Sequence, residues 1–331
     1  MAPSYNSVDQ QDILELETFI SSMVFADPSS SPIQILSPGR SAPLMEAASP
    51  HGMPWDTTIG HTAQSNPLLY MPFWIWQLDF MRHSLANLHP INCASNSSGG
   101  DFAYNENKIK CARVVNQCYA SDEYRKIRMT YYDAGDSMQV FNSVWYPDAK
   151  YNLPILGVDM LSFNRKKYLT IVDFQPLHKD ENDHATPYEH MLKPIREQYD
   201  NLKGRMSTKF YDETQFFSNE ILFARFEDDK IIKNDVFPTF QSYVKAHVDL
   251  IHSTQPLTKQ QEVEAVYERH RAYDTYSAGR DPAVGLFAAM FGAQWAEDFV
   301  HGFLFSLSER TEERVHLSDH QPLRQISLSR N

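Results

Sequence analysis

Alternating apolar and polar positions dominate the middle of the chain, between residues 123 and 176. Strands point successive side chains to opposite faces of a sheet, so this alternation predicts strands. Short turn-like segments interrupt it at 133–136 and 164–166, and consecutive strands with such links predict an antiparallel meander. We expect strands at 123–132, 137–146, 153–163 and 167–176, with a further strand at 215–226.

Helical periodicity flanks the strands on both sides in sequence. In 257–277, Thr258 is the expected N-cap, followed three residues later by Gln261 as in a capping box. An antiparallel sheet covered by such helices predicts a single α/β sandwich domain. We expect helices at 73–88, 191–202, 238–254 and 257–277, and from Asp281 to about residue 303.

Composition separates the two ends of the chain from this core. Residues 1–65 are rich in Ser, Pro and Ala and contain seven acidic residues against one arginine. We interpret them as a flexible N-terminal extension. A targeting role is left open, although transit peptides have the opposite charge balance. The folded domain is expected at 66–306, followed by a polar C-terminal tail at 307–331.

Charge and hydrophobicity exclude several classes of protein. A formal net charge of −12 on 331 residues argues against a general nucleic-acid binder. No apolar run approaches the roughly 20 residues of a membrane span, and we find no secretory signal. The three cysteines, Cys93, Cys111 and Cys118, are an odd and sparse set, which is typical of unbridged thiols in a reducing compartment.

Familiar catalytic and cofactor motifs are absent from the sequence. It contains no Gly-rich dinucleotide or phosphate loop, no G-x-S-x-G elbow and no C-x-x-C pair. His178, His184 and His190 lie in a polar stretch that we interpret as a loop, without a recognised ligand pattern, so we expect no metal site. If the protein is a redox enzyme, its electrons must come from outside.

Two polar residues stand on otherwise apolar strand faces, Asn142 and Asp159. A carboxylate among apolar neighbours is costly as an anion, so the pKa of Asp159 should rise. Such a carboxyl can hold a proton near neutral pH, as a proton donor must. By parity Asn142 shares its face with Met138, Val140, Val144 and Tyr146, and Asp159 shares its face with Ile155, Gly157, Leu161 and Phe163.

Four blocks of sequence resemble the ferredoxin-dependent bilin reductases. They are DAGDSMQVFNSVWYPDAKYNLPILGVDMLSF, YLTIVDFQP, QFFSNEILFAR and YDTYSAGRDPAVGLFAAMFGAQWAEDFVHGFLF, within roughly 67–306. The resemblance implies a three-layer α/β/α sandwich with a central antiparallel sheet and a bilin between the sheet and the C-terminal helices. It also implies a radical mechanism, with single electrons from reduced ferredoxin and no bound metal or flavin.

The resemblance assigns roles to individual positions. Asp159 matches the central sheet aspartate that protonates the bilin, and Asp281 matches a second aspartate whose importance varies among branches. Asn142 stands where the phycocyanobilin-forming branch has histidine, and Thr130 stands where that branch has a catalytic glutamate. Ser277 replaces an arginine typical of the branches that form phycoerythrobilin or phytochromobilin. The chain therefore looks most like the branch that reduces biliverdin IXα at its C15–C16 bridge, giving 15,16-dihydrobiliverdin.

Several assignments remain open at this point. Asp281 precedes a proline and can cap a helix as well as act on the bilin. Arg225 is a candidate partner for a propionate, and Val140 and Leu161 are expected to line the pocket beside Asn142 and Ser277. A four-electron reductase giving phycourobilin or phycoerythrobilin, and a non-catalytic bilin carrier, are the alternatives.

Partners and location follow from the same resemblance. The expected partners are ferredoxin, biliverdin and a downstream bilin reductase that takes the dihydrobiliverdin. We expect a monomer that binds neither nucleic acid nor membrane. The expected location is the plastid stroma in a eukaryote or the cytoplasm in a cyanobacterium.

Overall fold

The structure is a computed structural model that describes residues 68–91, 93, 102–177, 182–204 and 216–309. The extension expected at 1–65 and nearly all of the tail expected at 307–331 lie outside these residues. Those two predictions, and the domain limits that depend on them, stay predictions.

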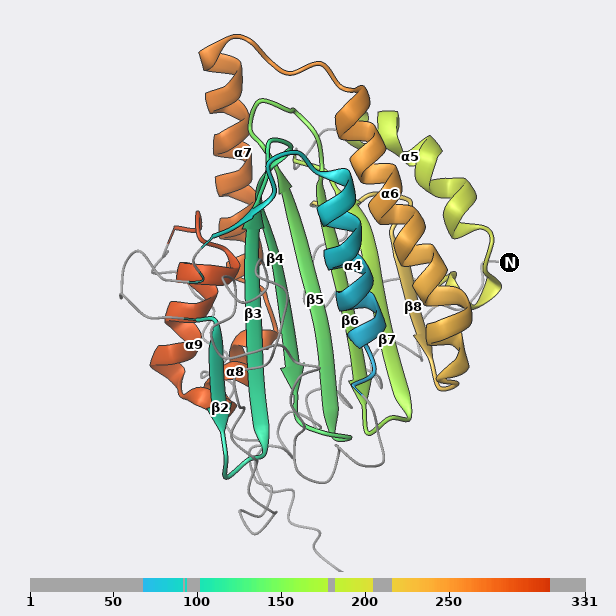
Figure 1. The fold of residues 1–331 in the computed structure, drawn as a ribbon, viewed down its shortest axis with the longest axis vertical. Coiled ribbons are helices and arrows are strands. Elements are labelled where there is room, and N and C mark those ends of the chain that lie inside the picture. The colour runs from blue at the N-terminus through green and yellow to red at the C-terminus, as the bar shows by residue number, and fades with distance from the viewer. Residues whose placement is uncertain (1–67, 92, 94–101, 178–181, 205–215, 310–331) are drawn as a thin grey trace, which may run out of the picture.

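One antiparallel sheet of eight strands forms the centre of the domain (Figure 1). Its order is β1-β3-β4-β5-β6-β7-β8, with β2 paired beside β1 on the outer edge of β3. The four strands from β4 to β7 are the predicted meander. The strands are β1 (His89–Pro90), β2 (Tyr104–Asn107), β3 (Ala112–Ala120), β4 (Tyr124–Asp133), β5 (Met138–Pro147), β6 (Ile155–Phe163), β7 (Lys167–Gln175) and β8 (Leu222–Phe226).

Helices cover both faces of the sheet, which gives the three layers expected from the family resemblance. In Figure 1, α4 and α6 lie in front of the sheet, and α7 to α9 lie on the opposite side. Two separate apolar cores correspond to these two faces. The helices are α4 (Met71–Ser84), α5 (Asn182–Arg196), α6 (Phe237–Ser253), α7 (Gln260–Ala278), α8 (Ala283–Phe291) and α9 (Ala293–Phe299), with shorter 3₁₀ or π segments at η1 (Asp200–Leu202), η2 (Ile232–Val236) and η3 (Val300–Leu304).

The tight turn between β6 and β7 is a three-residue connection, 164–166, in which the N–H of Lys166 donates to the carbonyl of Phe163 at 3.0 Å. Asn164 and Arg165 both have φ of 51°. Positive φ at both central residues matches the right-handed twist of the flanking strands, and asparagine tolerates this conformation better than most residues. The turn thus fixes the register of β6 against β7, and with it the face on which Asp159 lies.

The strand β3 and the first part of the segment 215–226 differ from the prediction. β3 was not predicted because apolar and polar residues do not alternate along it: Arg113, Asn116 and Gln117 are buried together with its apolar residues. Only Leu222–Phe226 of the second segment joins the sheet. Ser218 lies outside it because its backbone N–H and its hydroxyl both donate to the buried carboxylate of Asp173, the N–H at 2.9 Å. Asp173 therefore has a structural partner.

Two helix boundaries were also predicted wrongly. Helix α7 begins at Gln260, with Lys259 in the N-cap position and no side-chain capping bond, so Thr258 does not cap it. Helix α5 begins at Asn182, inside the stretch that we expected to be a loop. Neither difference changes which side of the sheet these helices cover.

Helix α4 shows the packing on the face away from the C-terminal helices. Trp74, Leu78, Met81 and Leu85 are all buried, as their spacing predicted. The Trp74 ring lies 6.2 Å from the Tyr131 ring and 6.1 Å from the Phe141 ring, measured between centroids. None of the helices in the described ranges has the length and hydrophobicity of a membrane span.

Candidate active site

Asn142 and Asp159 are directly opposite each other on the neighbouring strands β5 and β6. The same row of the sheet continues to Thr130 on β4 and to Ile171 on β7. Residues paired in this way project from the same face, so the parity argument made from the sequence is confirmed for the two polar residues.

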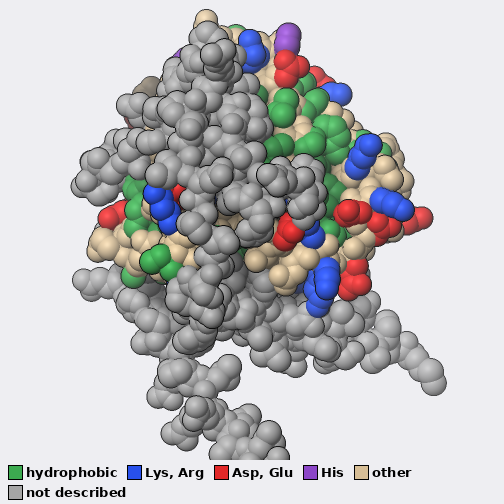
Figure 2. Space-filling view, turned by 60° about the horizontal axis from the view of Figure 1, so that its bottom comes forward, with side chains coloured by type: hydrophobic (Ala, Val, Ile, Leu, Met, Phe, Trp, Pro, Cys, Tyr) green, Lys and Arg blue, Asp and Glu red, His purple; other side chains and the backbone are tan. Residues whose placement is uncertain are grey.

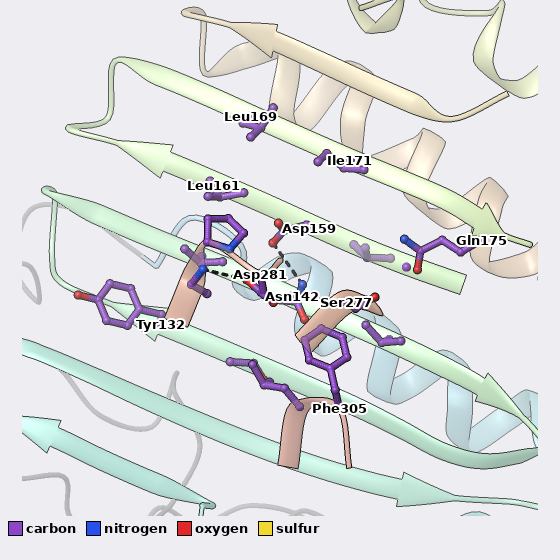
Figure 3. A pocket seen from close by; sticks show the side chains of 18 of the residues that line it. Tyr132, Asn142, Asp159, Leu161, Leu169, Ile171, Gln175, Ser277, Asp281 and Phe305 are labelled. Atoms are coloured by element: carbon purple, nitrogen blue, oxygen red, sulfur yellow. Dashed lines mark hydrogen bonds between the residues drawn. The ribbon is translucent and has the colours of Figure 1, made fainter. Parts of the chain in front are cut away.

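A cavity of about 220 Å³ lies between this face of the sheet and the C-terminal helices. Strands β4 to β8 form one wall, and the end of α7, the start of α8 and the segment after η3 form the other (Figure 3). The walls are mainly aliphatic and aromatic. Ligand sites are typically concave and apolar, with few polar groups, and this cavity has that character. The polar or charged side chains that line it include Arg128, Thr130, Asn142, Asp159, Gln175, Arg225, Ser277 and Asp281.

Every residue that we predicted for the site lines this cavity. Val140 and Leu161 are opposite each other and form the next pair beside Asn142 and Asp159 on this face of β5 and β6, and Ser277 lies at the end of α7. Arg225 is exposed on β8, at the side of the cavity away from β4, with its guanidinium 5.1 Å from the Phe223 ring. The roles predicted for these residues are not tested by their positions alone.

A chain of hydrogen bonds runs across the sheet wall and ends at Asp159. Arg128 donates through Nη1 to Oδ1 of Asn142, and Nδ2 of Asn142 donates to Oδ1 of Asp159 at 3.3 Å. Thr130 is opposite Asn142 but donates instead to Oδ1 of Asn116, at 2.7 Å. Asn142 therefore links a buried cation to a carboxyl group.

Burial is the main reason why the pKa of Asp159 rises to about 7. The nearby carboxyl of Asp281 raises this pKa further, while the hydrogen bond from Asn142 and the charge of Arg128 lower it. Removal from water disfavours an anion, and a second anion close by adds repulsion. Asp159 is thus protonated in a large share of molecules at neutral pH, as a general acid requires.

Asp281 both supports a helix start and faces the cavity. Its Oδ1 accepts the backbone N–H of Ala283 at 2.8 Å, in the first turn of α8. Figure 3 shows the side chain beside Asn142 and Asp159. Burial raises the pKa of Asp281, while the N–H of Ala283 and the charge of Arg128 oppose the rise. The two alternatives for this residue, a cap and a participant in the site, are therefore geometrically compatible.

Sequence reasoning did not single out Arg128 or the contact that joins the sheet to α7. In that contact the hydroxyl of Tyr273 donates to Oε1 of Gln175. Gly157 makes room for it, because a Cβ on Gly157 would lie 2.6 Å from the same oxygen. Strand parity could have found Arg128, two residues before Thr130, but nothing in the sequence indicated the meeting of Gln175 and Tyr273.

A family model described as "Ferredoxin-dependent bilin reductase" matches residues 82–306, about two thirds of the chain. The chain belongs to this family. No group of His, Cys, Asp and Glu side chains within the described ranges could hold a metal ion.

Named relatives of this bilin reductase fall in more than one branch. It is 40% identical to "15,16-dihydrobiliverdin:ferredoxin oxidoreductase" of Nostoc punctiforme over 237 residues, which cover 72% of this chain and 95% of that protein. It is 30% identical to "Phycoerythrobilin:ferredoxin oxidoreductase" of the same organism, covering 76% and 98%. Another "15,16-dihydrobiliverdin:ferredoxin oxidoreductase", from Gloeobacter violaceus, is 37% identical to this chain, and the match covers 77% of this chain and 99% of that protein.

A solved structure has the same fold. It is phytochromobilin synthase from tomato in complex with biliverdin, with a TM-score of 0.63. The match covers 72% of this chain and 83% of that chain at 19% identity, so it supports the fold and not a particular reaction.

Proposed function

We propose that this reductase catalyses the two-electron reduction of biliverdin IXα to 15,16-dihydrobiliverdin. Two reduced ferredoxins each give one electron, two protons are added, and the C15–C16 double bond becomes a single bond. The main support for a reduction with proton transfer to the bilin is Asp159, which lines an apolar cavity of this bilin reductase and can be protonated near neutral pH. The choice of the C15–C16 bridge rests on the greater identity to the relatives named for 15,16-dihydrobiliverdin.

The protein's task in this reaction is to supply protons and to hold the substrate. Asp159, kept neutral by burial, donates a proton to the bilin before or together with the first electron. The conjugated bilin stabilises the radical that a single electron creates. Asp281, whose pKa is also raised, is the proposed source of the second proton while it still supports the start of α8.

Substrate contacts are proposed for the residues around this pair. Val140 and Leu161, which are opposite each other beside the paired polar residues, provide apolar contact. Arg225, exposed at the far side of the cavity, is the proposed partner of a propionate, because an anion leaving water needs a cation or a hydrogen-bond donor. Ser277 is buried and small, which leaves room for the bilin where an arginine would fill it.

Electrons enter from ferredoxin, which is an acidic protein, so we propose that it docks on a locally basic surface. In Figure 2 the Lys and Arg side chains of the described residues are interspersed with Asp and Glu. Steering between opposite charges weakens as salt is added, so turnover with ferredoxin should slow at higher ionic strength.

Product identification tests the proposed reaction directly. The chain is incubated without oxygen with biliverdin, ferredoxin and a reductant for ferredoxin, and the bilins are separated by chromatography. We expect 15,16-dihydrobiliverdin as the released product, and no consumption of biliverdin when ferredoxin is left out. A product that retains the C15–C16 double bond, or a four-electron product released at once, would contradict the proposal. Binding without any turnover would indicate a carrier.

The pH dependence of turnover should reveal the raised pKa. Because the protonated form of Asp159 is active, kcat/KM for biliverdin should be constant at mildly acidic pH and fall above pH of about 7. The slope should approach tenfold per pH unit. An ordinary aspartate, with a pKa near 3.9, would already have lost its proton by about pH 5. Biliverdin binding and ferredoxin reduction, measured over the same range, serve as controls. A fall centred between pH 4 and about 5 would contradict the assignment.

A further inference from the structure

Arg128 is a buried cation in the wall of the cavity. It lies on β4 and is 2% exposed. Its partner across the β4–β5 ladder is Val144, so Asn142 is its diagonal neighbour. Diagonal positions on antiparallel strands lie about 7–8 Å apart, a distance that a long side chain can bridge. Arg128 makes this diagonal contact, through Nη1 to Oδ1 of Asn142.

This contact determines which way the Asn142 amide points. A guanidinium has only donors, so it must face the oxygen of an amide. The nitrogen of Asn142 must then face the other way, toward Oδ1 of Asp159, where it donates at 3.3 Å. Without a donor on its oxygen side, an amide can turn over and present its oxygen to the carboxyl group instead.

Arg113 shows how a purely structural arginine is bound in the same sheet. It lies on β3 and is 1% exposed, and its Nε and Nη2 both donate to Oδ2 of Asp133, at 3.2 and 3.1 Å. Among the residues that the structure describes, Arg128 has no such carboxylate partner. Its Nε is buried and makes no hydrogen bond to any described residue, and its guanidinium lies 5.4 Å from the Phe305 ring. A buried charge without a direct ion pair is costly, so stability alone does not account for Arg128.

We propose that Arg128 is a positioning residue for the proton donor. By holding the Asn142 amide in one orientation, it commits Oδ1 of Asp159 to accepting a hydrogen bond. The transferable proton is thereby placed on Oδ2. The inference rests on the proposed function only in taking Asp159 as that donor; the orientation of Asn142 follows from the bonds themselves.

Charges from both walls of the cavity act on this carboxyl. Asp281 faces it from the connection between α7 and α8, and Arg128 acts on it from β4. The same two charges act on the hydroxyl of Tyr273 on α7, where Arg128 lowers the pKa and Asp281 raises it. Arg225 lies on β8, and its charge is not among the causes of the shifted pKa of Asp159. Arg128 is therefore the cation whose removal should change the titration of Asp159.

The test uses Arg128→Met, which removes both the charge and the donor, beside Arg128→Lys, which keeps the charge. The first readout is the carbonyl stretch of protonated Asp159 in the infrared spectrum, identified by its loss in Asp159→Asn and titrated with pH without ferredoxin. We expect the midpoint to rise by roughly one pH unit in Arg128→Met, since an adjacent opposite charge shifts a carboxyl pKa by about 1–3 units. Arg128→Lys should stay near the native midpoint.

The second readout is kcat/KM, measured at a pH where Asp159 is protonated in all the variants. Arg128→Met should lose on the order of tenfold to a hundredfold, because a misdirected proton donor is a geometric defect. Arg225→Gln is the matched control for charge in the first readout, the infrared titration. It removes a cation that lines the cavity but does not belong to the chain of hydrogen bonds, so the Asp159 midpoint should not move.

An unchanged midpoint in folded Arg128→Met would overturn the role of Arg128, and so would an equal shift in Arg225→Gln. A shifted midpoint with native kcat/KM would also overturn the positioning role, because proton transfer would then not depend on the contact of Arg128 with Asn142. Asp159 as the donor is tested separately, by Asp159→Asn. Should Arg128→Met fail to fold, Arg128→Gln repeats the test. Glutamine is neutral but can still donate to Asn142, so the Asp159 midpoint should shift while kcat/KM falls by less than the tenfold to hundredfold expected for Arg128→Met. Native values of both the midpoint and kcat/KM would overturn the proposal.

Discussion

Asp159→Asn should bind biliverdin almost as the native chain does and lose about a hundredfold to ten-thousandfold in turnover. The amide has nearly the same shape as the carboxyl, so the cavity keeps its form, but it cannot supply a proton near neutral pH. Losses of this size are typical when a general acid is removed. Binding is measured by titrating the bilin absorbance, and turnover is measured under single-turnover conditions with reduced ferredoxin.

Asp173→Asn is the matched control for that experiment. Asp173 is another buried aspartate of the sheet, on the neighbouring strand β7, and burial raises its pKa to about 7 as well. Its carboxyl is bonded to Ser218 and does not line the cavity. Turnover per folded molecule should therefore be retained in Asp173→Asn. Equal losses in the two variants, or full activity in Asp159→Asn, would remove Asp159 from its proposed role.

Trp74→Ala should lower the free energy of unfolding by about 3–5 kcal/mol. Trp74 is fully buried against Tyr131 and Phe141, and removing its indole leaves a cavity in this core. A loss of this size is a large fraction of the stability of an ordinary domain. Chemical denaturation followed by circular dichroism measures it.

The adjacent residue provides the control. Ile75 also lies in α4 but is 46% exposed, so Ile75→Ala should change the free energy of unfolding by less than about 0.5 kcal/mol. The pair tests whether the periodicity of α4 was interpreted correctly. Similar effects of the two substitutions would contradict the placement of Trp74 in the core.

The local pattern of apolar and polar residues was sufficient to predict the meander and to place the two polar residues at its centre on one face. The alternation in β4 to β7 arises because one face of each strand packs on helices and the other lines the cavity. Parity alone therefore brought Asn142 and Asp159 to the same face. The same reasoning failed for β3, where the buried polar residues Arg113, Asn116 and Gln117 leave no alternation to detect. It also failed for Thr258, where the spacing to Gln261 predicted a capping box but the helix begins at Gln260 without a side-chain cap.

The helix wall of the cavity could not be derived from local pattern. Tyr273 and Gln175 are 98 positions apart in the chain, and only the folded arrangement brings them together. Asp281 was found through family resemblance, while the Asp-Pro pair suggested only a cap. Arg128 was within reach of parity, yet a charged residue in a strand is ordinarily taken to face solvent.

The glycine two positions before Asp159 has an effect beyond its own strand. Because Gly157 has no side chain, the amide of Gln175 can lie across β6 and accept the hydroxyl of Tyr273. This hydrogen bond ties the sheet to α7, the helix that leads to Asp281. The position of α7 against the sheet therefore depends on the missing side chain at Gly157. The distance between the carboxyl groups of Asp159 and Asp281 is in this way set by the fold before any substrate binds.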